Sequence, residues 1–188
     1  VLFTKFIITI GELWIFTNKI WVKALHKPRW QIIGKENIKS NGWTIATSNH
    51  QSFADIFLLQ DITNMKMPML KFFMKYVLIY VPVIGLSWWA LDMPFLKRYT
   101  KKQLEKNPKL AGKDIREMRR ALKHYSLYPV TVFSFAEGTR FTSKKHQNQN
   151  SPFENLLKPK EGGLATALSL VNKIDALIDF TIQFDSKK

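Results

Sequence analysis

Two short stretches of β-branched and apolar residues, 43–47 and 130–136, are each followed at once by a run of polar side chains. Both stretches are predicted to be strands. A third predicted strand, 178–184, lies near the end of the chain, and segments with a helical pattern separate the strands, at 53–60, 112–125 and 162–171. Strands that alternate with helices indicate an α/β fold, in which a layered mixed sheet is flanked by helices.

The rest of the chain is less regular. Residues 65–90 are largely apolar but are broken by Pro68, Pro82 and Gly85, and their periodicity does not distinguish a buried from a membrane-facing segment. Residues 141–159 have the Ser, Lys, Asn and Gln content of a long exposed loop. The length of 188 residues, without internal repeat or linker, predicts about one core.

The amino-terminal segment is apolar but interrupted by charge. Lys5, Glu12, Lys19 and Lys23 leave uncharged stretches far shorter than the ~18 to 20 residues that a membrane-spanning helix needs. On a helix at ~100° per residue the four charges share one narrow strip. Phe3, Ile7, Ile10, Trp14 and Trp21 fall on the opposite side.

Two interpretations of this segment stay open. The helix could lie in the head-group plane of a membrane, or it could pack on its own domain. We predict a membrane-associating helical segment at 1–30, followed by a domain at 31–188 that is truncated at its carboxyl end. The chain begins in apolar sequence and ends just after a predicted strand, so we expect that both ends are trimmed and that a membrane anchor precedes residue 1.

The composition restricts the classes of function. The net charge is +15 and the sequence pI is near 10.0, which predicts anionic partners such as phosphate compounds, an anionic membrane or nucleic acid. Residues 97–123 hold eleven basic side chains against three acidic ones. The chain has no cysteine, so disulfides, Cys-type zinc sites and cysteine nucleophiles are excluded.

The first polar run, residues 49–55, comes directly after a predicted strand and opens a predicted helix. It reads Asn-His-Gln-Ser-Phe-Ala-Asp. An imidazole whose second nitrogen meets a carboxylate is held in one tautomer and orientation, as a general base requires. The spacing allows His50 and Asp55 to form such a pair. The structural alternative is a capping box, Ser52-x-x-Asp55, which leaves His50 an ordinary loop residue.

The second polar run, Phe-Ala-Glu-Gly-Thr-Arg at 135–140, also follows an apolar strand. Ligands collect at strand ends in α/β folds. Gly138 lets a ligand approach the backbone, Thr139 offers a hydroxyl, and Arg140 can bind phosphate through two hydrogen bonds. The structural alternative is a strand-to-loop turn that contains a Glu–Arg ion pair.

A third block lies between the two runs: Lys75-x2-Leu78-x3-Pro82-x2-Gly85, followed by Arg98. Singly, its cations are typical of solvated charge. In this order and combination, the three blocks resemble the glycerolipid acyltransferase family, which contains the 1-acylglycerol-3-phosphate acyltransferases. The resemblance covers residues 49–140. Residues 92–95 and several positions in 141–163 are similar to a bacterial branch related to the lysocardiolipin acyltransferases.

The resemblance implies transfer of a fatty acyl group from acyl-CoA or acyl carrier protein to the free hydroxyl of a lysophospholipid. With 1-acylglycerol-3-phosphate as acceptor, the product is phosphatidic acid. His50 would be the general base, and Asp55 would orient its ring and balance its charge. The acceptor phosphate site would comprise Lys75, Arg98, Glu137, Gly138, Thr139 and Arg140. Glu137 matches the family's acceptor-site glutamate, with an internal salt bridge as the alternative.

The resemblance also bears on partners and location. It implies no metal or cofactor besides the thioester co-substrate, an anionic membrane surface as a partner, and a location at the cytoplasmic face of a bacterial inner membrane. Nucleic acid is not expected, because the sequence has no recognition-helix motif or zinc finger. A non-catalytic basic protein of the membrane surface is the alternative. Acylation of another lysophospholipid also stays open, because Ile178–Ile182 replaces the proline-bearing fourth block of the family.

Overall fold

The computed structural model describes residues 2–26, 29–38, 41–125, 127–171 and 173–184. Their strands are β1 Thr44–Ser48, β2 Leu70–Phe72, β3 Met74–Lys75, β4 Phe95–Leu96, β5 Thr131–Phe135 and β6 Ala176–Phe180. Their helices are α1 Leu2–His26, α2 Ala54–Thr63, α3 Ile84–Ala90, α4 Lys101–Lys106, α5 Lys113–Tyr125, α6 Ser143–Gln149 and α7 Glu161–Leu170. The predicted α/β class, a sheet flanked by helices, is confirmed, but the sheet is parallel in each described pair and not mixed as predicted.

The central sheet has the strand order β2-β5-β1-β6, and β3 and β4 form a second pair. Each described pair is parallel. β1 and β5 are in register from Thr44 with Thr131 to Ser48 with Phe135. Parallel strands end at the same edge of a sheet, so the two polar runs predicted to follow β1 and β5 emerge side by side.

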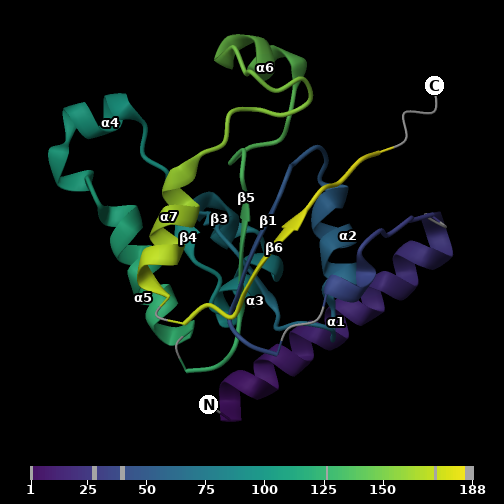
Figure 1. Cartoon of the computed structure of the whole chain (residues 1–188). Helices are drawn as coiled ribbons and strands as arrows, with labels where there is room; N and C mark the ends of the chain where they lie inside the picture. The colour runs from purple at the N-terminus through teal and green to yellow at the C-terminus, as the bar shows by residue number, and fades with distance from the viewer. Residues whose placement is uncertain (1, 27–28, 39–40, 126, 172, 185–188) are drawn as a thin grey trace.

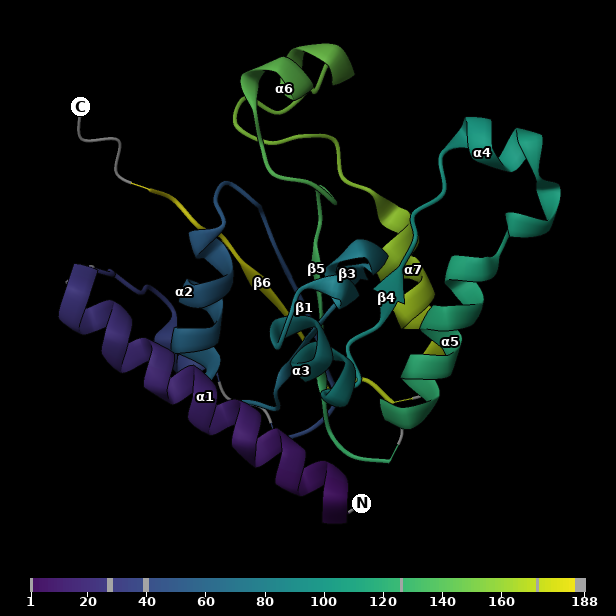
Figure 2. The same cartoon turned by 180° about the vertical axis from the view of Figure 1, so that it is seen from behind.

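Helices cover both faces of the central sheet (Figures 1 and 2). Ile45 and Val132 point to the face covered by α5 and α7, where they join one buried cluster. Their neighbours Ala46 and Phe133 point to the opposite face, where they join a second cluster with Leu59 of α2. Successive side chains of a strand alternate between faces, so both faces of β1 and β5 are buried.

Two of the four charged residues of α1, Glu12 and Lys19, lie toward the domain, whereas Lys5 and Lys23 are exposed. Lys19 Nζ lies 2.5 Å from Asp61 Oδ1 of α2, and the Asn64 side chain donates to the Glu12 carbonyl over 3.3 Å. Nine large apolar side chains of α1 are exposed: Phe3, Phe6, Ile10, Leu13, Trp14, Phe16, Ile20, Trp21 and Leu25. Packing on its own domain therefore does not account for the apolar side of α1.

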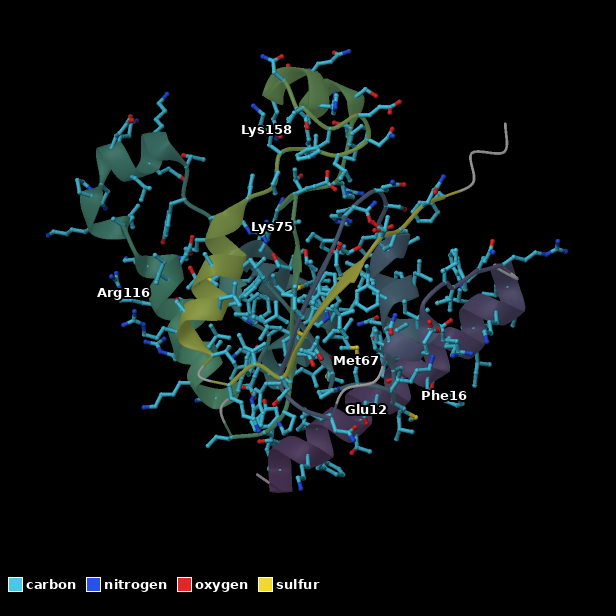
Figure 3. All side chains as sticks on the ribbon, viewed as in Figure 1. Glu12, Phe16, Met67, Lys75, Arg116 and Lys158 are labelled. Atoms are coloured by element: carbon cyan, nitrogen blue, oxygen red, sulfur yellow. The ribbon has the colours of Figure 1, made fainter. Side chains whose placement is uncertain are left out.

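Within the described residues, no helix combines the length and the apolar character required to cross a bilayer. An apolar cavity of about 240 Å³ separates parts of α1, the end of α2 and α3. Figure 3 shows two of its lining residues, Glu12 and Met67, in the lower half of the molecule. Burial raises the pKa of the Glu12 carboxyl there.

Two sequence expectations differ from the structure, and one segment was left without predicted elements. The last strand is β6, Ala176–Phe180, and not 178–184. Asp175 fixes the earlier start, because it exchanges backbone and side-chain hydrogen bonds with Trp43, directly before β1. The predicted loop at 141–159 contains α6, which begins where Thr142 accepts the Lys145 N–H at its amino terminus. Residues 65–90 contain two short strands and α3, for which no prediction was made.

Candidate active site

The turn between β1 and α2 brings His50 and Asp55 together. His50 Nδ1 lies 2.8 Å from Asp55 Oδ2, and the same oxygen accepts the backbone N–H groups of Gln51 at 2.7 Å and Ser52 at 2.9 Å. Asp55 is fully buried. One carboxylate therefore both orients the imidazole and holds the turn that leads into α2. Only half of the capping box is formed, because the Ser52 hydroxyl accepts the Ala54 N–H and not that of Asp55.

The His50 ring is held flat but stays accessible. It stacks on Phe135, the last residue of β5, with ring centroids 3.8 Å apart and an angle of 12° between the planes. Its side chain keeps 14% exposure, whereas that of Asp55 keeps none. When ionised, the Asp55 carboxylate only accepts hydrogen bonds, so Nδ1 donates to it and Nε2 of a neutral ring is left as the acceptor. This is the state that a general base needs.

Glu137 fixes the backbone around His50. It is 3% exposed, and its two oxygens accept the backbone N–H groups of His50 and Leu157, each at 2.9 Å. The Phe141 N–H donates in turn to the His50 carbonyl over 2.7 Å. Among the described residues, Glu137 does not form the Glu–Arg ion pair that was considered as an alternative. Its two partners, 87 and 20 residues away in sequence, are backbone groups.

Asn49 connects the same turn to the segment just after β6, the strand next to β1. Its side chain donates to the Ile182 carbonyl over 2.8 Å and accepts the Ile182 N–H at 2.7 Å. This two-bond contact resembles a short piece of sheet pairing beyond β6. No local sequence signal distinguishes Asn49 from any other loop asparagine, because its partner is 133 residues away.

Arg98 and Gly138 lie in contact, as the resemblance implies for the second and third blocks. The Arg98 guanidinium donates to the carbonyls of Gly138 at 3.2 Å and Phe73 at 3.1 Å. Desolvation lowers the pKa of Arg98, and the nearby Asp114 acts in the opposite direction. Gly138 has a φ of +65°, which favours glycine at this position. Arg98 therefore joins β4 to the turn after β5.

Two lysines that the sequence analysis did not single out lie on the same turn. Lys145 of α6 donates to Thr139 Oγ1 at 2.8 Å and to the Arg140 carbonyl at 2.9 Å. The chain of Lys160 covers Gly138, whose missing Cβ would lie 2.9 Å from Lys160 Cδ. A local signal that could have indicated α6, and with it Lys145, is Thr142, because threonine is a favoured helix N-cap. It would not have shown that the Lys145 side chain turns toward Thr139.

Lys75 is placed near this region through the backbone. It pairs with Leu96 across β3 and β4, two residues before Arg98. Figure 3 shows it higher in the molecule than Glu12 and Met67. Its side chain is exposed, and so is that of Arg140. Within the described part of the chain no hydrogen bond fixes either side chain, so their contact with a phosphate stays a prediction.

The arrangement can bind an anion beside a base. The turn at 138–140 ends in Arg140 and is contacted by Arg98, Lys145 and Lys160. Directly before this turn, the Glu137 carboxylate accepts the His50 backbone N–H. Among the described residues no group of three or more His, Asp or Glu side chains is placed to hold a metal ion.

Comparison with known proteins identifies the family of the chain. Residues 29–182 match the family model described as Acyltransferase. The chain is 32% identical over 125 residues to a 1-acyl-sn-glycerol-3-phosphate acyltransferase delta of Bos taurus, which covers 61% of this chain and 30% of that protein. It is 28% identical over 167 residues to 1-acyl-sn-glycerol-3-phosphate acyltransferase 3 of Arabidopsis thaliana, with 81% and 39% covered.

A third relative, 1-acyl-sn-glycerol-3-phosphate acyltransferase gamma of Homo sapiens, is 30% identical over 129 residues, with 63% of this chain and 31% of that protein covered. The chain thus spans less than half the length of these relatives. No solved structure matches. The family match extends over most of the chain and includes all three polar blocks. The chain therefore belongs to the Acyltransferase family.

Proposed function

We propose that this chain transfers a fatty acyl group from an acyl thioester to the free hydroxyl of a lysophospholipid, with 1-acylglycerol-3-phosphate as acceptor and phosphatidic acid as product. The observation that carries the proposal is the partly exposed His50 ring, bonded to buried Asp55 over 2.8 Å and backed by Phe135. The names of the three relatives favour this acceptor.

In the proposed reaction His50 Nε2 takes the proton of the acceptor hydroxyl while its oxygen attacks the thioester carbonyl. The new C–O bond forms, the C–S bond breaks, and the proton passes from His50 to the leaving thiolate. Asp55 holds the ring and balances the charge it acquires. A positioned base of this kind contributes typically ~10² to 10⁴ in rate. The direct attack needs no acyl-enzyme intermediate.

Binding of the acceptor phosphate is assigned to the turn at 138–140. Arg140 and Lys75 have exposed side chains, and Lys145 lies against Thr139. Arg98 uses two of its donors on backbone carbonyls and keeps others for an anion. We assign Glu137 a positioning role through the His50 backbone, because both of its oxygens are engaged.

The test is acyl transfer by the purified protein in detergent micelles. 1-Acylglycerol-3-phosphate and a panel of other lysophospholipids are offered with acyl-CoA or acyl carrier protein, and the products are identified by mass spectrometry. We expect phosphatidic acid from the wild type and a loss of ~10² to 10⁴ in kcat for His50→Ala. His146→Gln is the control, because glutamine can still donate to the Phe153 carbonyl that the His146 ring contacts at 2.6 Å. Unchanged turnover of folded His50→Ala protein contradicts the mechanism.

We also propose that the protein acts at a membrane surface, at the cytoplasmic face. The support is the exposed apolar side of α1, with Leu13 52% and Ile20 54% exposed, on a helix that is joined to α2 by the Lys19–Asp61 ion pair. Large apolar patches mark sites of interaction with proteins or membranes. Phe53 and Phe57, at the start of α2 near His50, are also exposed. A lipid substrate could then reach the ring from this side.

Vesicle flotation tests the membrane proposal. Wild-type protein is expected to float with vesicles that contain anionic lipid. The double variant Leu13→Glu/Ile20→Glu is expected to stay in the soluble fraction, because two charges then replace apolar contact area. Ile115→Glu/Leu127→Glu is the matched control, since both side chains are exposed at 48% and 66% but lie outside α1. Equal flotation of the two variants contradicts the role of α1.

A further inference from the structure

Residues 76–90, which follow β3, form an apolar projection that contains no charged residue. The projection consists of a 3₁₀ helix, Tyr76–Tyr80, and α3, and Figure 2 shows α3 in front of the central sheet. Gly85 joins the two helices closely, because a Cβ there would collide with the Ile79 carbonyl. Eight large apolar side chains of this 76–90 segment are exposed: Tyr76, Val77, Tyr80, Val81, Val83, Ile84, Leu86 and Trp89. Exposed apolar patches of this kind mark sites of interaction.

The exposed side chains of α3 point in several directions. Ile84, Leu86 and Trp89 are 39%, 65% and 62% exposed, and at ~100° per residue they cover more than half of the helix circumference. A protein groove takes up one apolar face of a helix. Lipid, in contrast, surrounds an inserted element on most of its sides. The directions of these side chains therefore favour lipid over a protein groove as the partner.

Polar groups at the tip of the segment bond within the segment itself. Pro82 has no N–H, and its carbonyl accepts the Ile84 N–H at 2.6 Å. The Val83 carbonyl accepts both the N–H and the hydroxyl of Ser87, at 2.9 Å and 2.8 Å. Unpaired polar groups are costly in the apolar part of a bilayer. This internal pairing lowers the free energy of moving the tip out of water.

Val83, at the tip, has a conformation that β-branched residues rarely adopt. Its φ is +62° and its ψ is −56°, and the bond from the Ile84 N–H to the Pro82 carbonyl closes a strained γ-turn around it. The Val83 side chain is 78% exposed. Backbone strain of this kind concentrates at functional positions. An exposed valine gains nothing in water that would offset the strain, whereas burial of the side chain in lipid would offset it.

Cations lie at the base of the segment. Lys75 directly precedes it and is exposed, and Lys97 Nζ lies 4.8 Å from the centre of the Tyr76 ring. Lys97 also begins the basic stretch at 97–123. An apolar tip above an aromatic and cationic base matches a bilayer with anionic head groups. A second copy of the chain is disfavoured as the partner, because each copy carries a net charge of +15.

The 76–90 segment adjoins the exposed apolar side of α1. Ile10 and Trp14 of α1 line the apolar cavity of about 240 Å³ together with Val83 and Ile84. Figures 1 and 2 both show α3 beside α1. A bilayer in contact with α1 therefore lies within reach of the segment as well.

We infer that the 76–90 segment enters the head-group region of an anionic bilayer as a second contact, separate from α1. The inference goes beyond the proposed function, which places only α1 at the membrane. A single helix that lies on a bilayer can roll about its own axis. Two contacts at different points fix the orientation of the whole domain on the bilayer.

Site-specific fluorescence tests the inference without any turnover. The chain contains no cysteine, so a single introduced cysteine is labelled selectively. Leu86→Cys, labelled with an environment-sensitive fluorophore, is mixed with vesicles of phosphatidylcholine and phosphatidylglycerol. We expect its emission to shift to shorter wavelength and to be quenched by phospholipids brominated on their acyl chains. Leu168→Cys is the matched control and is expected to show neither change, because this exposed leucine lies on α7, across the central sheet from the segment.

Vesicle flotation measures how much the segment contributes to binding. For Val77→Glu/Leu86→Glu we expect partitioning into the same vesicles to fall at least about tenfold, equivalent to about 1.4 kcal/mol, because two charges replace apolar contact area. The control Leu168→Glu/Leu177→Glu changes side chains that are 45% and 61% exposed and is expected to float as the wild type does. The fluorescence experiment introduces no charge, so it does not depend on the folding of the glutamate variants.

Several outcomes overturn the inference. A label at Leu86→Cys that vesicles leave unchanged, while one at Leu13→Cys is quenched, would restrict the contact to α1. Equal quenching of the Leu86→Cys and Leu168→Cys labels would show unspecific adsorption. A wavelength shift that grows with protein concentration in the absence of vesicles would assign the segment to a second copy. Equal flotation with phosphatidylcholine alone would remove the anionic head groups. Loss of acyl transfer with intact quenching at Leu86→Cys would instead reject only the proposed function.

Discussion

Two clusters of buried charged side chains lie on different sides of the sheet. At the carboxyl ends of the strands, Asp55 and Glu137 are 0% and 3% exposed, and their hydrogen bonds converge on His50. Toward α5, Lys71 of β2 is 1% exposed and donates to the Leu91 carbonyl over 2.6 Å. Both clusters bury charge, but only the first presents a partly exposed titratable ring.

The members of the second cluster are buried: Lys71 is 1%, Tyr125 1% and Tyr128 8% exposed. Lys71 Nζ lies 5.8 Å from the ring centres of Tyr125 and Tyr128. Burial lowers the pKa of Lys71 to about 8, and Asp92 partly offsets the shift. Burial also raises the pKa of both tyrosines. The cluster joins β2 to the turn before β4 through Leu91 and Asp92.

The comparison teaches that a buried charge is not by itself a sign of chemistry. The free energy of burying Asp55 and Glu137 is offset by backbone N–H donors, which also fix the position of an accessible base. The free energy of burying Lys71 is offset by one carbonyl and two aromatic rings, which fix the course of the chain. The two clusters differ in accessibility: the hydrogen bonds of the first orient His50, which is partly exposed, whereas Lys71 in the second is buried.

The largest expected effect comes from matched carboxylate-to-amide changes within the first cluster. Asp55→Asn removes the charge that orients His50, and we expect kcat to fall by ~10²-fold or more. Glu137→Gln leaves the His50–Asp55 contact intact. The amide NH2 of the new glutamine then faces a backbone N–H, so one of the two hydrogen bonds is lost. A stability loss of roughly 1–3 kcal/mol and a smaller loss of kcat are expected. Acyl-transfer kinetics and urea unfolding of both variants measure the two effects.

Either result could go against this division of roles. An Asp55→Asn variant that turns over like the wild type would mean that Asp55 serves only the turn at Gln51 and Ser52. A folded and stable Glu137→Gln variant that loses as much kcat as Asp55→Asn would mean that Glu137 contacts the reacting groups. In that case the direct acceptor role implied by the family resemblance would replace the positioning role.

What the sequence could predict depends on how local the determining contacts are. The His50–Asp55 pair lies within six residues, and the polar runs follow strands whose apolar pattern is clear. The helix predicted at 112–125 corresponds to α5, Lys113–Tyr125, because its apolar stripe follows the helical period. The Glu137 partners, the Asn49–Ile182 contact and the start of β6 depend on residues far apart in sequence, which no periodicity reveals.

Lys71 illustrates the same limit from the other cluster. Lys71 has no local sequence signal of burial, because the groups around its ammonium, on Leu91, Tyr125 and Tyr128, lie 20 or more residues further along the chain. Residues 65–90 gave no periodic signal because three short elements, β2, β3 and α3, succeed one another within them. The sequence thus predicted the His50–Asp55 pair and missed the burial of Lys71.

The smallest expected effect concerns the pH dependence of stability in the second cluster. The pKa of Lys71 is about 8 in the folded protein and ~10.4 in an unfolded chain. Between these values the unfolded state binds more protons, so the free energy of unfolding of the wild type rises with pH. Below pH 8 both states are protonated, and the full cost of burying the charge is present. Lys71→Met removes this contribution.

The difference in unfolding free energy between Lys71→Met and the wild type should therefore shift in favour of the wild type from pH 8 to pH 10. The shift is at most on the order of 3 kcal/mol. Urea unfolding followed by circular dichroism at four pH values measures it, and Lys102→Met on α4 controls for loss of one positive charge. A constant difference across the range would mean that Lys71 titrates alike in both states and that water reaches its ammonium group. The contrast between an open and a closed cluster would then fail, because Lys71 would be as accessible as His50.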